Sequence, residues 1–138
     1  MPAIETQCRC GAVALKISGE PIVQLYCHCD DCQSAQSAAY VKAAIYPAAA
    51  VEIARGAPVA SAVISLQRMR CAGCGTYLFA EIETVGGRSV NSYLLPEGVF
   101  KPQFHVQCQY AALPVVDELP HYRGFPAAFG GREEYVAW

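Results

Sequence analysis

The chain has little charge and no concentration of basic residues. Charged side chains make up 16% of its 138 residues, and the ten lysines and arginines are scattered without a run. A protein that binds nucleic acid needs a concentrated basic surface, so the composition argues against that class. No apolar run approaches the roughly 20 residues of a membrane-spanning helix, so we expect no membrane partner.

Histidine is scarce as well, with only His28, His105 and His121 in the sequence. They lie far apart, which excludes the paired histidines of a DNA-binding zinc finger. Residues 1–6 lack the basic stretch followed by an apolar stretch that marks an export signal. We therefore expect a cytoplasmic protein, in a compartment that keeps thiols reduced and disfavours a disulfide framework. A length of 138 residues suits one core, and we predict a single domain over residues 1–138.

Cysteine is the residue that the chain has in excess. Seven of its eight cysteines fall into three tight clusters, namely Cys8 and Cys10, then Cys27, Cys29 and Cys32, then Cys71 and Cys74. A structural zinc ion is held by four protein ligands, whereas a reactive zinc ion keeps one position for water or substrate. Four plus three cysteines therefore indicate two Zn²⁺ ions, one in a closed site and one in an open site.

The spacing within each cluster suits a metal ion. Residues i and i+2 of an extended segment point to the same side, so Cys8 and Cys10 can bind one ion together. The first two cysteines of the second cluster have the same spacing. Cys71 and Cys74 have the spacing of a two-ligand knuckle across a turn. Each cluster is therefore a partial binding site.

Glycine distinguishes the first and third clusters from the second. Gly11 follows Cys10 and Gly75 follows Cys74, and glycine permits the positive φ that a tight turn around a metal needs. Gln33 follows the last cysteine of the second cluster instead. The sequence therefore favours a closed site of Cys8, Cys10, Cys71 and Cys74 and an open site of Cys27, Cys29 and Cys32.

Other interpretations of the cysteines stay open. The second cluster can take a fourth ligand from another cluster, and both ions can serve folding alone. An iron–sulfur cluster or a redox dithiol fits less well, because bacterial iron–sulfur motifs repeat Cys-x-x-Cys in tighter succession. Copper suits soft ligands, but zinc fits tetrahedral sites made only of thiolates better. Cys108 stands outside the clusters and is expected to be a buried free thiol.

Alternating apolar residues predict a mainly β protein. The expected strands cover residues 13–17, 22–26, 40–46, 59–69, 77–82, 89–95 and 103–110. The fifth and sixth of these join across Gly86 and Gly87, which suits a hairpin. Helical signals are limited to residues 30–39 and a turn near Asp117. We predict an all-β, mainly antiparallel fold with one or two short helical turns. Prolines and glycines predict that residues 113–138 form an irregular tail packed on the sheet.

Two histidines lie on predicted strands near the cysteines. On the strand 103–110, His105 shares a face with Gln107, opposite a face of core-like residues that includes Cys108 and Tyr110. We expect His105 either to face a cleft as an acid or base or to hydrogen-bond within the sheet. His28 stands between two proposed metal ligands and points away from them, so we expect it to be packed or exposed rather than a ligand.

The order of these motifs resembles the glutathione-dependent formaldehyde-activating enzyme family. The resemblance rests on Cys8-Arg9-Cys10-Gly11, Cys27-His28-Cys29 followed by Cys32, Arg68 ahead of Cys71 to Gly75, and Phe104-His105-Val106. It covers the chain from Cys8 to about Pro120. It implies an Mss4-like β-tent, in which zinc pinches the sheets. It also implies a structural zinc on the first and third clusters and a catalytic zinc on the second.

The resemblance further implies an activity. The family name indicates a carbon–sulfur lyase that handles the adduct between formaldehyde and the glutathione thiol, so the expected partner is a small thiol or its aldehyde adduct. Arg68 and His105 match the family's arginine and late histidine and are the candidate substrate-binding residues. Arg70 replaces the family's usual aromatic residue, and Ser37 replaces a common glycine. The alternative is a zinc-stabilised module that binds or carries a thiol without turnover.

Overall fold

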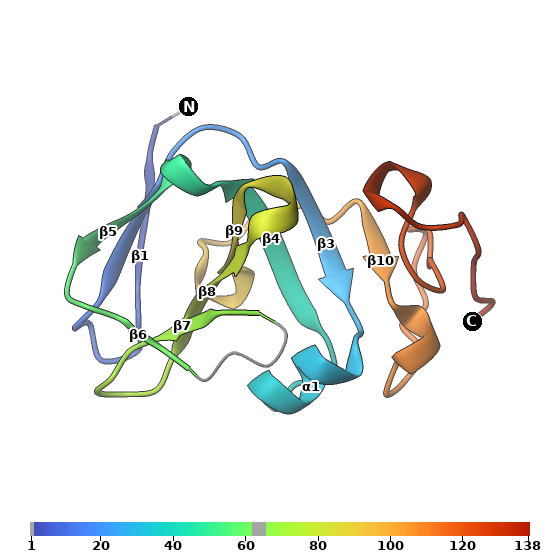
Figure 1. Ribbon diagram of the computed structural model, residues 1–138, viewed down its shortest axis with the longest axis horizontal. Helices are drawn as coiled ribbons and strands as arrows, with labels where there is room; N and C mark the ends of the chain where they lie inside the picture. The colour runs from blue at the N-terminus through green and yellow to red at the C-terminus, as the bar shows by residue number, and fades with distance from the viewer. Residues whose placement is uncertain (1, 62–65) are drawn as a thin grey trace. The chain divides into compact units, whose positions relative to one another are not determined.

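The computed structural model describes residues 2–61 and 66–138, which form two compact units. Unit 1 comprises Met1–Val23 and Ala44–Phe100, and unit 2 comprises Gln24–Ala43 and Lys101–Trp138. Figure 1 labels their helices and strands. Strands predominate and pair mainly antiparallel, which confirms the predicted fold class. No helix in the described part of the chain has the length and apolar character needed to cross a membrane.

Unit 1 begins with a three-stranded antiparallel sheet. Its order is β1 (Ile4–Gln7), β2 (Ala14–Ile17) and β5 (Val51–Arg55). Leu15 and Ile17 of β2 are buried while Lys16 is exposed, as the alternation of apolar residues predicts. The strands β1 and β5 were not predicted, although Val51 and Ile53 alternate with more polar neighbours.

The second group of strands in unit 1 is built around a hairpin. The order is β4 (Val41–Pro47, from Ala44 onward), β9 (Gly87–Asn91), β8 (Tyr77–Ile82), β7 (Arg68–Arg70) and β6 (Val59–Ala60). The predicted hairpin joins β8 to β9 through the 3₁₀ turn η2 (Glu83–Val85) and Gly86, which has φ 62°. A Cβ on Gly87 would lie 2.7 Å from Ile45 Cγ2, so this position needs glycine.

The core of unit 1 lies between these strands. Its largest fully buried side chains include Leu15, Ile17, Tyr46, Leu78 and Phe79. Two cysteines of the closed cluster, Cys8 and Cys71, belong to the same buried group. The core therefore positions this cluster directly.

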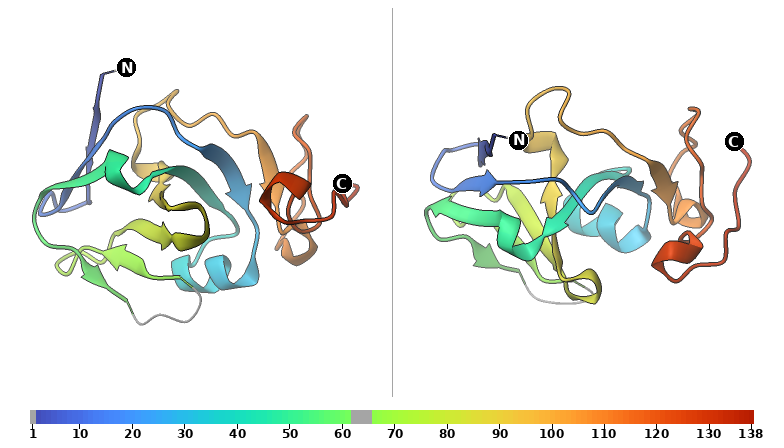
Figure 2. Two further views of the ribbon diagram at one scale, coloured as in Figure 1. Left: turned by 45° about the horizontal axis from the view of Figure 1, so that its top comes forward. Right: turned by 90° about the horizontal axis from the view of Figure 1, so that it is seen from above.

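Unit 2 contains a parallel strand pair and one α-helix. The pair joins β3 (Val23–Cys27, from Gln24 onward) to β10 (Phe104–Val106), and α1 (Asp30–Gln36) follows β3. After β10 come η4 (Cys108–Tyr110), η5 (Ala127–Phe129) and irregular chain. Backbone hydrogen bonds from His105 N to Pro120 O and from Tyr122 N to His105 O hold the tail beside β10 (Figures 1 and 2).

Several predicted elements differ from the structure. The strand predicted over 103–110 ends at Val106, because Gln107 adopts φ 57° and η4 follows. The strand predicted over 89–95 ends at Asn91, whose side chain accepts a hydrogen bond from Tyr93 N and starts the 3₁₀ turn η3 (Ser92–Leu94). Asp117 begins a bend rather than a helical turn, since its side chain accepts from Leu119 N.

The strand predicted over residues 59–69 is observed only at its ends. β6 and the first residues of β7 lie within it, while residues 62–65 are outside the described part of the chain. The two observed strands pair antiparallel, with Val59 opposite Arg70 and Ala60 opposite Met69. The described ends of the predicted strand are therefore two strands that pair with each other.

Candidate metal centres

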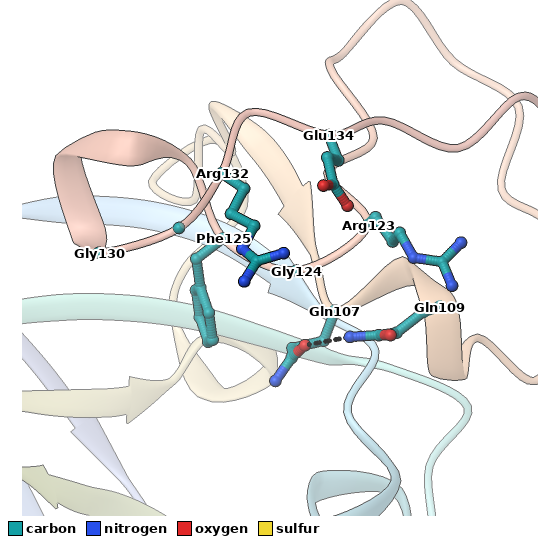
Figure 3. Close-up of a pocket in the computed structure, with 9 residues that line it drawn as sticks. Gln107, Gln109, Arg123, Gly124, Phe125, Gly130, Arg132 and Glu134 are labelled. Atoms are coloured by element: carbon teal, nitrogen blue, oxygen red, sulfur yellow. Dashed lines mark hydrogen bonds between the residues drawn. The ribbon is translucent and has the colours of Figure 1, made fainter.

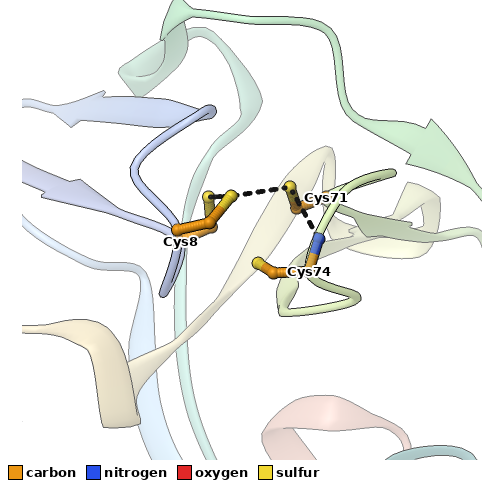
Figure 4. Close-up of side chains that lie close together, drawn as sticks. Cys8, Cys71 and Cys74 are labelled. Atoms are coloured by element: carbon orange, nitrogen blue, oxygen red, sulfur yellow. Dashed lines mark hydrogen bonds between the residues drawn. The ribbon is translucent and has the colours of Figure 1, made fainter.

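The four cysteines of the first and third clusters meet in unit 1 (Figure 4). The sulfur of Cys10 lies 3.7 Å from that of Cys8 and 3.7 Å from that of Cys71. Cys74 completes the group, whose sulfur atoms all lie within 4.8 Å of one another. Sulfur atoms bound tetrahedrally to one ion at about 2.3 Å are about 3.8 Å apart. The structure thus brings together the four residues that the glycine pattern pairs, at a spacing that suits a metal ion.

Two tight turns present these sulfur atoms. In the first, Gly11 N donates to Cys8 O at 3.0 Å, and Gly11 has φ 81°. In the second, Gly75 N donates to Cys71 O at 2.9 Å, and Gly75 has φ 76°. Both glycines therefore have the left-handed conformation that the sequence predicts.

Arg70 supports the second turn. Its guanidinium donates to Gly75 O at 3.3 Å and lies 5.8 Å from the centre of the Tyr77 ring. Arg70 therefore combines an aromatic contact with a hydrogen bond to the turn. These contacts support the closed cluster locally.

Hydrogen bonds favour the ionised form of two thiols in this cluster, those of Cys8 and Cys74. Val13 N–H donates to Cys8 Sγ at 3.3 Å and lowers the pKa of Cys8. The hydroxyl of Thr76, 3.0 Å from Cys74 Sγ, lowers the pKa of Cys74 to about 5, with help from the Thr76 backbone. A thiolate is the form that binds a metal, so these donors favour two of the four ligands. The pKa of Cys10 is lowered by the Ala12 backbone but raised to about 11 overall by the neighbouring thiols, so full ionisation of the cluster needs a cation.

The second cluster forms where β3 ends and α1 begins. Cys27 is the last residue of β3, Cys29 caps α1, and Cys32 lies buried in its first turn. Cys32 N donates to Cys29 Sγ at 3.1 Å, and the sulfur atoms of Cys27 and Cys32 lie 3.9 Å apart. No fourth metal-binding side chain from the described residues of unit 2 joins the three sulfurs. They can therefore hold a metal ion and leave a position for another ligand.

The electrostatics of the second cluster oppose ionisation. The neighbouring thiols of Cys29 and Cys32, together with burial, raise the pKa of Cys27 well above its usual value. Like charges disfavour one another in a buried site, whereas a divalent cation would reverse this effect. The second cluster therefore depends on a cation to become a set of thiolates.

The helix that follows the second cluster is tied to its surroundings. Gln33 Nε2 donates to His28 O and to Tyr110 O, both at 2.8 Å. Ser37 ends the helix with φ 52°, and its N–H bonds to Gln33 O. A left-handed position at a helix end is one that glycine adopts without strain.

A buried histidine cluster lies in the same unit. His28 and His105 are both 0% exposed, and His28 Nε2 lies 2.8 Å from His105 Nδ1. His105 Nε2 lies 2.7 Å from Asp117 Oδ2, and His121 Nε2 lies 3.0 Å from Asp117 Oδ1. His28 is packed, as expected. His105 was predicted to lie on the face of its strand opposite the core-like residues. It is nevertheless fully buried, because the tail covers β10 on that side.

Sequence reasoning missed the tail residues of this cluster. The ring of Trp138 lies 5.4 Å from that of His28 and 4.7 Å from that of His121. A parallel bridge between His105 and His121 brings these residues together. The Asp-x-x-x-His spacing of residues 117 and 121 is the one sequence signal for this cluster. It places the two side chains near His105 only because His121 forms a bridge with His105.

The remaining predicted residues have these positions. Arg68 is 5% exposed in β7 of unit 1, whereas the open cluster belongs to unit 2. Cys108 is buried, as expected, and burial raises its pKa to about 12. Tyr110, predicted to face the core, is 47% exposed because the chain turns at η4. None of the eight cysteines, all within the described residues, forms a disulfide.

Unit 2 also has a surface pocket of about 440 Å³ (Figure 3). Its polar lining includes Gln107, Gln109, Arg123, Arg132 and Glu134, and Gln109 Nε2 donates to Gln107 Oε1 at 3.3 Å. Neither a cysteine nor a histidine lines it. The pocket is therefore separate from the residues that can hold a metal.

Comparisons with known proteins found one matching family model and a similar solved structure. Residues 3–111 match the family model described as glutathione-dependent formaldehyde-activating enzyme. No curated protein matches the chain. A crystal structure of a Rhodobacter sphaeroides protein from a structural genomics programme is similar, with a TM-score of 0.56 and 22% identity over 70% of this chain and 90% of that chain. That likeness concerns the fold. The match over residues 3–111 includes all seven clustered cysteines, and the chain belongs to the glutathione-dependent formaldehyde-activating enzyme family.

Proposed function

We propose that this protein is a zinc-dependent enzyme that makes or breaks the carbon–sulfur bond between a thiol, such as glutathione, and a small aldehyde, such as formaldehyde. Family membership supports the reaction class. The observation that carries the proposal is the difference between the two cysteine groups, since one offers four sulfur atoms and the other three. We propose a structural zinc in the first and a catalytic zinc in the second, in a reducing compartment such as the cytoplasm.

The donor set fits zinc. Both groups consist only of sulfur, and the measured sulfur separations of 3.7 and 3.9 Å bracket the roughly 3.8 Å expected for tetrahedral zinc thiolates. Bound by Cys27, Cys29 and Cys32, zinc would supply a Lewis acid with one position for a substrate sulfur or oxygen. The residues present therefore suit the proposed group.

The chain contributes rigid positioning at the open cluster. Pairing of β3 with β10 fixes Cys27, and the hydrogen bond from Cys32 N to Cys29 Sγ fixes the start of α1. When the adduct forms, the thiol sulfur bonds to the aldehyde carbon and the thiol proton passes to the aldehyde oxygen. The lyase direction reverses both changes without any redox step. Holding sulfur and carbon side by side lowers the entropic barrier in either direction.

We propose that Arg68 and His105 bind the substrate, because both match the family pattern. A guanidinium suits the carboxylates of a thiol peptide. His105 is fully buried and bonded at both ring nitrogens, so direct contact with a substrate would require it to exchange a partner. This geometry favours a role in supporting the loop from Cys27 to Cys29 over a role in direct contact with the substrate.

The test compares two cysteine variants. Cys29→Ala should lose one zinc equivalent and the acceleration of adduct formation, while circular dichroism shows a folded protein. Cys108→Ala, a change at a cysteine outside both groups, should keep both zinc ions and the activity. Zinc is counted by elemental analysis, and the exchange of glutathione with its formaldehyde adduct is followed by NMR. Activity that survives Cys29→Ala contradicts the proposal. Glutathione binding without acceleration in the native protein would favour a thiol carrier.

A further inference from the structure

The residue between the first two cysteines of the open cluster is fixed at three atoms. His28 N donates to Val106 O at 3.0 Å, and His28 O accepts from Gln33 Nε2 at 2.8 Å. The third atom is ring nitrogen Nε2, 2.8 Å from His105 Nδ1. The backbone between Cys27 and Cys29 is therefore held partly through a buried side chain.

The protons in the hydrogen bonds that link His28, His105 and Asp117 can be placed from the charge of Asp117. Although burial raises its pKa, hydrogen bonds from His105 and Leu119 lower it overall, so Asp117 is ionised and only accepts. His105 then carries its proton on Nε2, and its bare Nδ1 accepts from the Nε2–H of His28. The two ring nitrogens lie 2.8 Å apart, so one proton lies between them and the contact is a single hydrogen bond from His28 to His105.

The distances favour hydrogen bonds over a third metal ion. His105, Asp117 and His121 are residue types that can hold a metal. Their nitrogen–oxygen separations are 2.7 and 3.0 Å. Tetrahedral ligation at about 2.0–2.1 Å would separate such atoms by about 3.3 Å. The cysteine sulfurs have metal-ligand spacing, whereas these atoms have hydrogen-bond spacing.

We propose that Asp117 is a positioning residue for the open cluster, acting through His105 on His28 and so on the loop from Cys27 to Cys29. The inference rests on the proposed metal role of that cluster. In many metal sites a carboxylate accepts a hydrogen bond from a ligating histidine and orients it. Asp117 orients His105 in the same manner, but neither His105 nor His28 is itself a proposed ligand. The family match ends at residue 111, so Asp117, His121 and Trp138 of the tail add this support from outside the matched segment.

The tail also supplies an internal reporter. Trp138 is the only tryptophan of the chain, and its ring lies 5.4 Å from that of His28 and 6.1 Å from that of His105. Its fluorescence therefore reports whether the histidine cluster stays packed in a variant. Collapse of the tail can be separated in this way from loss of one hydrogen bond.

The experiment measures metal affinity at both cysteine groups in the full chain. Asp117→Ala should weaken Co²⁺ binding at the open cluster by about tenfold, the lower end of what supporting groups contribute. It should also change the Co²⁺ absorption spectrum of that site and leave the closed cluster unaffected. Asp117→Asn should recover most of the affinity, because its amide oxygen still accepts from His105 Nε2–H. Glu118→Ala, at the exposed neighbouring residue, is the matched control.

Each other outcome overturns the inference. Unchanged open-site affinity and spectrum in Asp117→Ala show that the chain of hydrogen bonds does not position the loop. Equal weakening of both clusters, with altered Trp138 fluorescence, shows general destabilisation instead. Loss of a third metal equivalent in Asp117→Ala and Asp117→Asn shows that the histidine cluster is itself a metal site. A native protein that binds no metal at Cys27, Cys29 and Cys32 contradicts the proposed function, and this inference with it.

Discussion

The two cysteine groups place the same side chain in different surroundings. In unit 1, hydrogen bonds from Val13 and Thr76 lower the pKa of Cys8 and of Cys74. In unit 2, neighbouring thiols and burial raise the pKa of Cys27. In the four-cysteine group too, the pKa of Cys10 is lowered by the Ala12 backbone but raised to about 11 overall by neighbouring thiols. Both groups therefore need a cation to become fully ionised, and in the four-cysteine group hydrogen-bond donors already favour two of the thiolates.

The backbone elements that hold the two cysteine groups also differ. Each half of the four-cysteine group is a short turn that bonds within itself, as Gly11 N to Cys8 O shows. The three-cysteine group sits between a strand end and a helix cap, with buried histidines behind the loop. A self-contained closed site suits a structural ion, and an open site supported from outside suits an ion whose ligands change.

Removing one ligand from each group should give the largest contrast. Cys71→Ala should lower the free energy of unfolding by more than about 4 kcal/mol, the range typical of a lost metal. Cys71 belongs to the core of unit 1, so this loss also leaves an unfilled space there. Cys29→Ala should cost much less. Thermal unfolding of both variants in zinc-replete buffer checks the comparison, which fails if the two midpoints fall equally.

Stepwise metal removal should separate the groups by thiol labelling. A chelator of moderate strength should free the open site first, so iodoacetamide at pH 7.5 then labels Cys29, ahead of Cys27, whose pKa is raised, and Cys32, which is buried. Cys108 should stay unlabelled until denaturant is added, because it is buried and its pKa is raised to about 12. Mass spectrometry of peptides reads the order. Early labelling of the four-cysteine group would reverse the assignment.

A change at one turn should sharpen the contrast further. Gly75→Ala should cost about 1–2 kcal/mol, because Gly75 has φ 76° and a left-handed conformation is unfavourable for alanine. No atom lies within 4 Å of the added Cβ, so the cost is one of backbone alone. Gly98→Ala, with φ 83° and equally open space, tests the same backbone cost away from the cysteines. A selective loss of zinc affinity is expected only in Gly75→Ala, and its absence would show that this turn does not set the site.

The smallest effect is expected beside the open cluster. Ser37→Gly should stabilise the protein by about 0.5–1 kcal/mol, because Ser37 holds φ 52° at the end of α1 and glycine adopts this conformation without strain. Chemical denaturation measures the change. Ser37→Ala serves as the control for loss of the hydroxyl. Destabilisation by glycine would show that the serine side chain matters more than the backbone.

Local patterns predicted much of the closed site. Gly11 and Gly75 follow the cysteines that meet, and their positive φ values agree with the prediction. The period of two placed β2 correctly, because Leu15 and Ile17 pack on the core while Lys16 is exposed. Both signals depend on neighbours in sequence, which a sequence shows directly.

The histidine cluster could not be predicted in this way. It requires β10 to pair parallel with β3 and the tail to cover β10, and neither contact leaves a local pattern. The alternation used for His105 failed because β10 is only three residues long and Gln107 turns the chain. Tertiary contacts, rather than strand period, decide which side chains are buried there.

Cadmium-113 NMR of the metal-loaded protein distinguishes a closed from an open cysteine site. We expect two resonances, one from the four-sulfur site and one from the three-sulfur site. Added glutathione should shift only the second, towards the position of a four-sulfur site, as an external sulfur takes the remaining position. A single resonance, or a response to glutathione at the four-cysteine group, would contradict the division into a closed and an open site.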